Sequence, residues 1–128
     1  MSIESVAGDP EPRIVLSDAG LVSPAAPLVV RSTSSATEVR VEARGEVDIS
    51  TAALLRVELA DALRTADSVV VDLTDVTFMD SQGLRVLIEA RVAAEDRPFV
   101  VAAASPNVRR LIKVSGLDES FGMSAELR

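Results

Sequence analysis

The chain of 128 residues contains no histidine, cysteine, tryptophan or tyrosine. These absences exclude a Ser-His-Asp triad, a cysteine nucleophile, a zinc site built from cysteine or histidine, and a disulfide framework. The side chains left for chemistry are carboxylates, hydroxyls, amides, arginines and a single lysine, Lys113. We therefore predict that the protein is not an enzyme and uses no catalytic residue, metal or cofactor.

Positive charge is scarce, with 13 basic against 20 acidic residues and a net charge of −7. A nucleic-acid partner requires clustered Lys and Arg to neutralise its phosphates, so this balance argues against one. Of the three phenylalanines, Phe78 and Phe99 lie in strongly apolar runs. We predict that both are buried in a core and are not available to stack on bases.

Long apolar runs are also absent. The longest, residues 99–104, is far shorter than the roughly 20 residues needed to cross a bilayer. Residues 1–5 lack the cationic start of a secretory signal. We therefore expect a cytoplasmic protein without direct membrane insertion.

Proline is concentrated at the start of the chain, where residues 1–27 hold four of the six prolines and show no helical or strand period. We interpret these residues as a flexible N-terminal extension, in which residues 14–16 suit a short strand. From residue 28 the hydrophobic pattern becomes regular. Residues 28–128 have the size of a single domain.

Within this domain, predicted strands and helices alternate. Residues 39–43 alternate apolar and charged side chains, which predicts a strand with one wet face. The first four expected elements are strand 28–30, strand 39–43, a helix from Ser50 or Thr51 to Arg64, and strand 69–71 ending in Asp72. Helix 81–94 follows, with Leu84, Leu87, Ile88 and Val92 on its core side. The last two are strand 99–104 and a helix that is capped by Ser105-Pro106 and stops at Gly116. This alternation predicts an α/β fold.

The segment best suited to function is Asp80-Ser81-Gln82-Gly83, which opens the second predicted helix. There the Ser81 hydroxyl lies beside backbone N–H groups that have no helical partner, a setting that favours an anion. A plain N-cap at Asp80 or Ser81, worth about 1 kcal/mol, is the ordinary explanation of such a pattern. Gly83 favours a further role, because glycine in a first helical turn costs roughly 1 kcal/mol and indicates a close approach to the backbone.

Ser81 is poorly equipped to act as a nucleophile by itself. The available bases are carboxylates, whose ordinary pKa of about 4 makes them weak proton acceptors for serine. Asp80, as the immediate neighbour, does not face Ser81 on a helix. Modification by another enzyme requires only an exposed hydroxyl and a tolerable product, and a helix start provides both.

Residues 69–88, VVVDLTDVTFMDSQGLRVLI, resemble the central signature of STAS domains, the sulfate-transporter and anti-sigma-factor-antagonist family. In that signature a valine-rich strand leads through an Asp and a Phe to Asp-Ser-x-Gly-Leu. Three further segments agree in order and spacing: residues 44–48, RGEVD, with the family's Gly-Glu-Leu-Asp turn, residues 51–63 with its first helix, and residues 107–121, NVRRLIKVSGLDESF, with its Arg-containing helix and Gly-Leu-Asp exit. The resemblance covers about residues 28–123.

The resemblance implies a single domain with a STAS-like mixed β-sheet and packed α-helices. It also implies that the protein acts as an anti-sigma-factor antagonist. Ser81 then matches a serine phosphorylated by an anti-sigma serine kinase of the histidine-kinase-like ATPase type, and a phosphatase resets the protein. The residues implied to contact the partner are Asp48, Thr51, Asp80, Ser81, Gln82 and Gly83. Family members usually continue into a C-terminal helix, which is largely missing from residues 28–128.

Other interpretations stay open. Asp48 taken alone is more ordinary as a turn or capping residue than as a contact residue. A STAS regulatory subunit of a membrane transport ATPase, or a scaffold in a signalling assembly, would use Ser81 for contact only. A phospho-aspartate receiver would use Asp72, but it needs a lysine at the end of a later strand, and Lys113 falls in a predicted helix.

Overall fold

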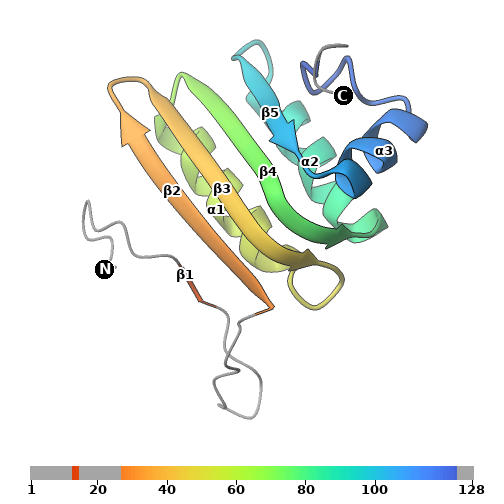
Figure 1. Ribbon diagram of the computed structural model, residues 1–128. Helices are drawn as coiled ribbons and strands as arrows, with labels where there is room; N and C mark the ends of the chain where they lie inside the picture. Colours follow the sequence, from red (N-terminus) through yellow and green to blue (C-terminus); the bar gives the residue numbers. More distant parts are fainter. Residues whose placement is uncertain (1–12, 15–26, 124–128) are drawn as a thin grey trace.

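The computed structural model describes residues 13–14 and 27–123 (Figure 1). The predicted flexible extension falls almost wholly on residues outside this described part, as do residues 15–16 of the predicted short strand and residues 124–128 at the C-terminus. Arg13 and Ile14 form a two-residue strand, β1.

Five strands form one mixed sheet in the order β1-β2-β3-β4-β5. Strands β1, β2 and β3 pair antiparallel, whereas β3, β4 and β5 run parallel and are joined through α1 and α2, which lie behind the sheet in Figure 1. The elements are β1 (Arg13–Ile14), β2 (Leu28–Ser35), β3 (Glu38–Val47), α1 (Ala52–Thr65), β4 (Ser68–Met79), α2 (Ser81–Ala94), β5 (Phe99–Ala104) and α3 (Pro106–Val114). The predicted α/β class with a mixed sheet in a single domain is confirmed.

Strand β3 has the predicted wet face. Val39, Val41 and Ala43 are buried, while Arg40 on the other face donates hydrogen bonds to Asp72 at 2.7 Å and to Glu42 at 3.2 Å. Burial alone would raise the pKa of the Asp72 carboxyl, but hydrogen bonds from Thr74 and Arg40 outweigh it and hold that pKa below its usual value. On this face of the sheet, an ion pair between charged side chains therefore links β3 to β4.

Strand β4 is longer than the sequence predicts, with 12 residues. The prediction that this strand ends at Asp72 was wrong, because β4 continues beside β3 until Met79 pairs with Val47. Two register shifts interrupt this pairing, and they break the alternation of buried and exposed residues: Val76 and Met79 are buried three positions apart. The second half of β4 therefore has no clean two-residue period in the sequence.

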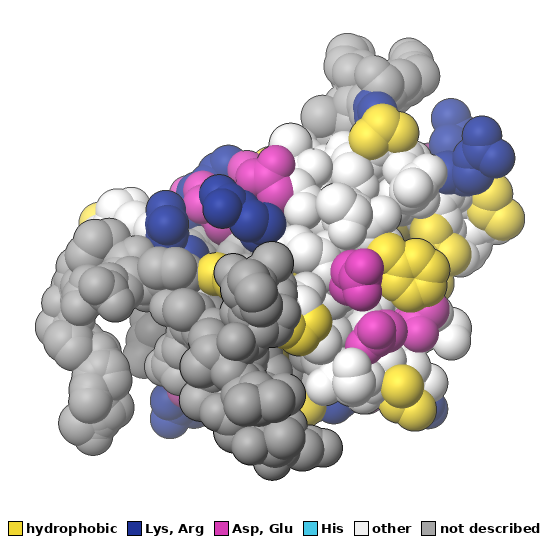
Figure 2. Space-filling model, turned by 60° about the horizontal axis from the view of Figure 1, so that its bottom comes forward, with side chains coloured by type: hydrophobic (Ala, Val, Ile, Leu, Met, Phe, Trp, Pro, Cys, Tyr) yellow, Lys and Arg dark blue, Asp and Glu magenta, His cyan; other side chains and the backbone are white. Residues whose placement is uncertain are grey.

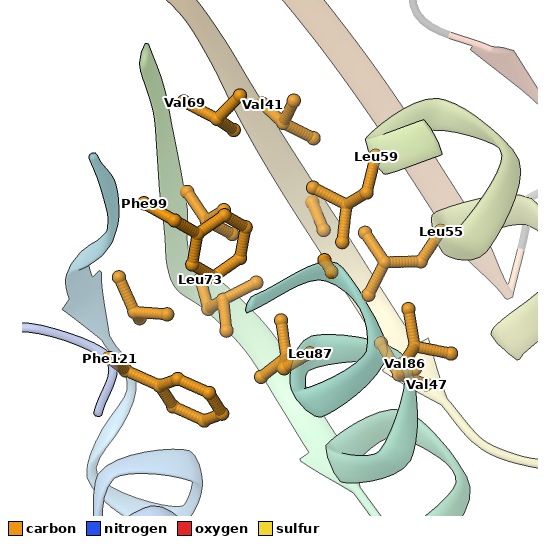
Figure 3. Packing of buried hydrophobic residues seen from close by; sticks show 14 of the residues in the cluster. Val41, Val47, Leu55, Leu59, Val69, Leu73, Val86, Leu87, Phe99 and Phe121 are labelled. Carbon is orange, nitrogen blue, oxygen red and sulfur yellow. The ribbon is translucent and has the colours of Figure 1, made fainter. Parts of the chain in front are cut away.

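One hydrophobic core lies between the sheet and the helices. Figure 3 shows Leu55 and Leu59 of α1 and Leu87 of α2 among the side chains that pack against the valines of β3 and β4. Among residues 13–14 and 27–123, no helix combines the length and apolar character that a membrane span requires.

The predicted core side of α2 is wrong at two positions, because Ile88 and Val92 are exposed. The helix instead buries Leu87 together with Ala90 and Ala94. Alanine fills a closely packed interior without strain or void, so packing here favours the alanine side although isoleucine and valine are more hydrophobic.

The last described residues, from α3 onward, pack beside β5 at the edge of the sheet. Helix α3 stops as predicted, with Gly116 at a φ of +74° and the Leu117 N–H donating to the Ile112 carbonyl at 3.0 Å, as in a Schellman motif. The Phe121 carbonyl then accepts from the Val101 N–H at 2.8 Å, and its ring meets Phe99 edge-on at 6.4 Å. Phe121 thus fills a place in the core beside β5.

Candidate functional site

The start of α2 presents Ser81 to solvent. Asp80 is the N-cap, and its Oδ1 atom accepts hydrogen bonds from the N–H groups of Gln82 at 2.8 Å and Gly83 at 3.4 Å. Between Asp80 and Ser81, which the sequence left as equal candidates for the cap, the structure selects Asp80. The Ser81 side chain, at the first helical position, is exposed.

Gly83 is approached closely by this chain's own core. A Cβ atom at this position would lie 2.6 Å from Met79 Cγ and 2.8 Å from Val47 Cγ1, and Gly83 itself is buried. The close approach that the sequence indicated therefore exists, and it is supplied by the ends of β3 and β4. Glycine allows α2 to begin directly against the last residues of these two strands.

The loop from Asp48 to Thr51 is held by its own polar side chains. The Asp48 carboxylate accepts from the Ser50 hydroxyl at 2.7 Å and from the Ser50 N–H at 2.9 Å. These hydrogen bonds from Ser50 are the main reason why the pKa of Asp48 lies below its usual value. Thr51 Oγ1 donates to the Glu46 carbonyl at 2.8 Å and accepts from the Asp48 N–H at 2.9 Å.

Thr51 occupies the N-cap position of α1, but its side chain makes no cap hydrogen bond. The predicted start of this helix at Ser50 or Thr51 is close to the observed one, yet the side chain that accepts from the Thr51 N–H is Asp48, at 3.2 Å. The Thr51 side chain is buried, with 2% of its surface exposed.

The two loops meet at the same end of the molecule, because β3 and β4 are parallel neighbours and their carboxyl ends share one edge of the sheet. The Asp80 N–H donates to the Val47 carbonyl at 3.2 Å, which links the start of α2 to the end of β3. All six residues implied as partner contacts therefore come from one region. Ser81 is exposed, Asp48, Asp80 and Gln82 are partly buried, and Thr51 and Gly83 are buried.

Sequence reasoning missed two exposed hydrophobic residues in this region. Ile49 is 79% exposed and Phe78 is 48% exposed. The prediction that Phe78 is buried was wrong: a register shift sets it opposite Glu46, while its neighbour Met79 takes the buried position. Figure 2 looks onto this end of the molecule and shows hydrophobic and acidic side chains next to one another.

Four carboxylates surround these residues: Glu46, Asp48, Asp75 and Asp80. In the described part of the chain, none of them forms an ion pair with a Lys or Arg side chain. The same residue ranges contain no group of three Asp or Glu side chains able to hold a metal ion. The region thus combines these carboxylates with an exposed hydroxyl and two exposed apolar side chains.

Comparison with known proteins places this geometry in a family. The family model described as "Mlab, STAS domain" matches residues 30–126. The crystal structure of an anti-sigma factor antagonist from Mycobacterium paratuberculosis is similar, with a TM-score of 0.71 and 27% identity over 77% of this chain and 86% of that chain.

Two structures of SpoIIAA share the fold at lower identity. The anti-sigma factor antagonist SpoIIAA in its unphosphorylated form has a TM-score of 0.63 and 20% identity over 70% of this chain and 83% of that one. The Bacillus cell fate determinant SpoIIAA in the phosphorylated form has a TM-score of 0.59 and 19% identity, covering 70% and 86%.

These similar structures are therefore those of anti-sigma factor antagonists. The family match spans most of the described domain and includes the Asp-Ser-x-Gly segment at the start of α2. The resemblance seen in the sequence is confirmed, and this chain belongs to the STAS domain family.

Proposed function

We propose that the protein is a cytoplasmic anti-sigma-factor antagonist, which binds an anti-sigma serine kinase of the histidine-kinase-like ATPase type and is switched off when that kinase phosphorylates Ser81. The observation that carries the proposal is the arrangement at the start of α2. Asp80 satisfies the first backbone N–H groups, so the Ser81 hydroxyl is exposed and is not used as the cap. The similarity to an anti-sigma factor antagonist at 27% identity supports the same role.

The site suits a phosphate acceptor better than a catalyst. The nearest carboxylate in the chain is Asp80, whose Oδ1 already accepts hydrogen bonds from the α2 backbone. Carboxylates are weak bases for serine, and hydrogen bonds from Ser50 lower the pKa of Asp48 further. The kinase therefore supplies the chemistry and a phosphatase reverses it, while this chain supplies the acceptor and the docking surface.

The test is to incubate the purified protein with ATP and, one at a time, each histidine-kinase-like ATPase of its source organism, followed by peptide mass spectrometry. We expect one of these kinases to place a single phosphate on Ser81, and we expect Ser81→Ala to stay unlabelled. Ser50→Ala is the matched control, because Ser50 is exposed in the neighbouring loop, and it should be labelled like the parent.

Stoichiometric labelling of Ser50, Thr51 or Ser105 in the Ser81→Ala protein would contradict the assignment of the acceptor. Failure of every kinase to bind or label the parent, together with copurification of a membrane transport ATPase, would instead favour a STAS regulatory subunit of that ATPase.

A further inference from the structure

The polar residues that the family resemblance implies as partner contacts are largely used inside the molecule. Asp48 Oδ1 accepts from both the hydroxyl and the N–H of Ser50, and Thr51 Oγ1 joins the Glu46 carbonyl to the Asp48 N–H. A partner group that binds Asp48 Oδ1 or Thr51 Oγ1 would compete with bonds that hold the loop. Asp48 and Thr51 therefore position the loop, and the large apolar side chain that the loop presents to solvent is Ile49.

Phe78 is presented in a similar way by β4. Phe99 and Phe121 are buried in the core, so Phe78 is the exposed aromatic ring of the described residues. It is opposite Glu46 in the register and two residues before Asp80, the cap of α2. Large aromatic and apolar side chains that become desolvated on binding carry much of the energy of protein interfaces.

The charge around these side chains indicates what the partner carries. Glu46 and Asp75 are exposed, and among the described residues neither pairs with a cation. The exposed Ile88 on α2 has a different setting, because its neighbour Glu89 pairs with Arg56 at 2.9 Å. Unpaired carboxylates at one end of the molecule favour a partner surface of opposite charge.

We infer that Phe78 and Ile49 are the anchor residues of the partner interface, and that the partner is a protein with an apolar pocket bordered by Arg or Lys side chains. The inference rests on the proposed function, since it takes the anti-sigma kinase as that partner. Ser81 lies close in sequence to Phe78, so a phosphate on it would have to be desolvated beside an apolar contact. This is a reason for phosphorylation to oppose binding even though the rim of the partner is cationic.

The test uses the kinase found to label Ser81, held in its ADP-bound form, and calorimetric titration with the full chain. We expect Phe78→Ala to lose at least about tenfold in affinity, with smaller losses for Ile49→Ala and Phe78→Leu. Val92→Ala is the matched control, because Val92 is exposed near the other end of α2 from Ser81, and it should bind within about twofold of the parent. Circular dichroism melts of each variant separate lost contacts from lost folding.

Salt dependence tests the charge of the pocket rim. Raising the salt concentration should weaken binding of the parent, and the combined Glu46→Gln and Asp75→Asn protein should depend less on salt. Parental affinity of Phe78→Ala, while Ser81 is still phosphorylated, would overturn the anchor assignment and leave the proposed function standing. Affinity that is insensitive to salt would overturn the cationic rim. Neither binding nor phosphorylation of the parent by any kinase would overturn the proposed function itself, and the inference with it.

Discussion

At position 83 the packing has no room for a side chain. Alanine normally favours a helix over glycine by about 1 kcal/mol. Here the added methyl group would lie well inside van der Waals contact with Met79 Cγ and Val47 Cγ1, at 2.6 and 2.8 Å. Both neighbours are themselves buried in the core, so they have little freedom to move away.

We therefore expect Gly83→Ala to lower the free energy of unfolding by about 1–2 kcal/mol, because overpacking outweighs the gain in helix propensity. Urea denaturation measures this difference. Ser81→Ala, in the same helical turn but exposed, is the control and should change the free energy by no more than about 0.5 kcal/mol. A Gly83→Ala protein as stable as the parent would show that the strand ends can yield.

The individual residues of the site were predictable to different degrees. Ser81 and Asp80 could be found from the Asp-Ser-x-Gly spacing, because both lie at a helix start, where free backbone N–H groups are always present. The exposure of Phe78 could not, because it depends on a register shift between β3 and β4 that leaves no periodic signal in the sequence. The exposure of Ile49 depends on the hydrogen bonds of Asp48 and Thr51, which fold the loop back on itself.

At the scale of the elements, Arg97 connects the ends of two helices. Its guanidinium donates to the carbonyls of Leu63 and Ala66 at the end of α1 and of Ala93 at the end of α2, and its Nε donates to the Ala94 carbonyl. Carbonyls in a last helical turn lack partners within the helix, and a cation there is favourable. One side chain thus completes both helix ends, where β4 and β5 begin, at the end of the sheet opposite the site.

Replacing Arg97 by Met keeps most of the aliphatic length but removes the donors, and we expect a loss of about 1–3 kcal/mol in the free energy of unfolding. Arg64→Met is the matched control, since Arg64 is exposed in the last turn of α1 and pairs with Asp61 on the same helix. It should cost no more than about 0.5 kcal/mol. Equal losses for the two variants in urea denaturation would contradict this role of Arg97.

Among the elements, those whose ends are marked by capping or stop residues in the sequence were predictable. Helix Ser81–Ala94 and strand Phe99–Ala104 have the bounds that the sequence indicated, and α3 ends in the expected Schellman motif. The second half of β4 was not predictable, because bulges hide its strand period. The buried side of α2 was misplaced because packing selects small alanines there over Ile88 and Val92.

At the scale of the whole molecule, phosphorylation of Ser81 should leave the fold intact. A phosphoryl group adds about −1.5 to −2 charges at pH 7, and the α2 N-terminus favours such a charge by typically 0.3–1 kcal/mol. The carboxylates of Asp80 and Asp48 oppose it, by about 1 kcal/mol for two charges roughly 4 Å apart in water. Because these contributions have opposite signs and act at an exposed site, we expect the main effect of the phosphate to appear at the interface.

We expect the Ser81-phosphorylated protein to melt within about 5 °C of the parent but to bind the kinase at least about tenfold more weakly. Ser81→Asp should lose affinity less completely, and Ser81→Ala should bind and resist inactivation. Thermal circular dichroism and calorimetric titration of the parent, the phosphorylated protein and the two variants provide the comparison. Loss of binding that is accompanied by unfolding would point to a different mechanism.

The two-residue turn between β2 and β3, Ala36–Thr37, lies at the opposite end of β3 from the loop that carries Ile49. Ten residues of extended strand separate the two ends, a span of about 30 Å at ~3.3 Å per residue. Ala36 already holds a φ of +41°, which glycine adopts without strain, so a glycine-flanked insertion suits this turn. A fluorophore or immobilisation tag placed there would leave the whole acidic end free, and the protein could be displayed on a sensor surface in a single orientation with Ser81 facing the solution.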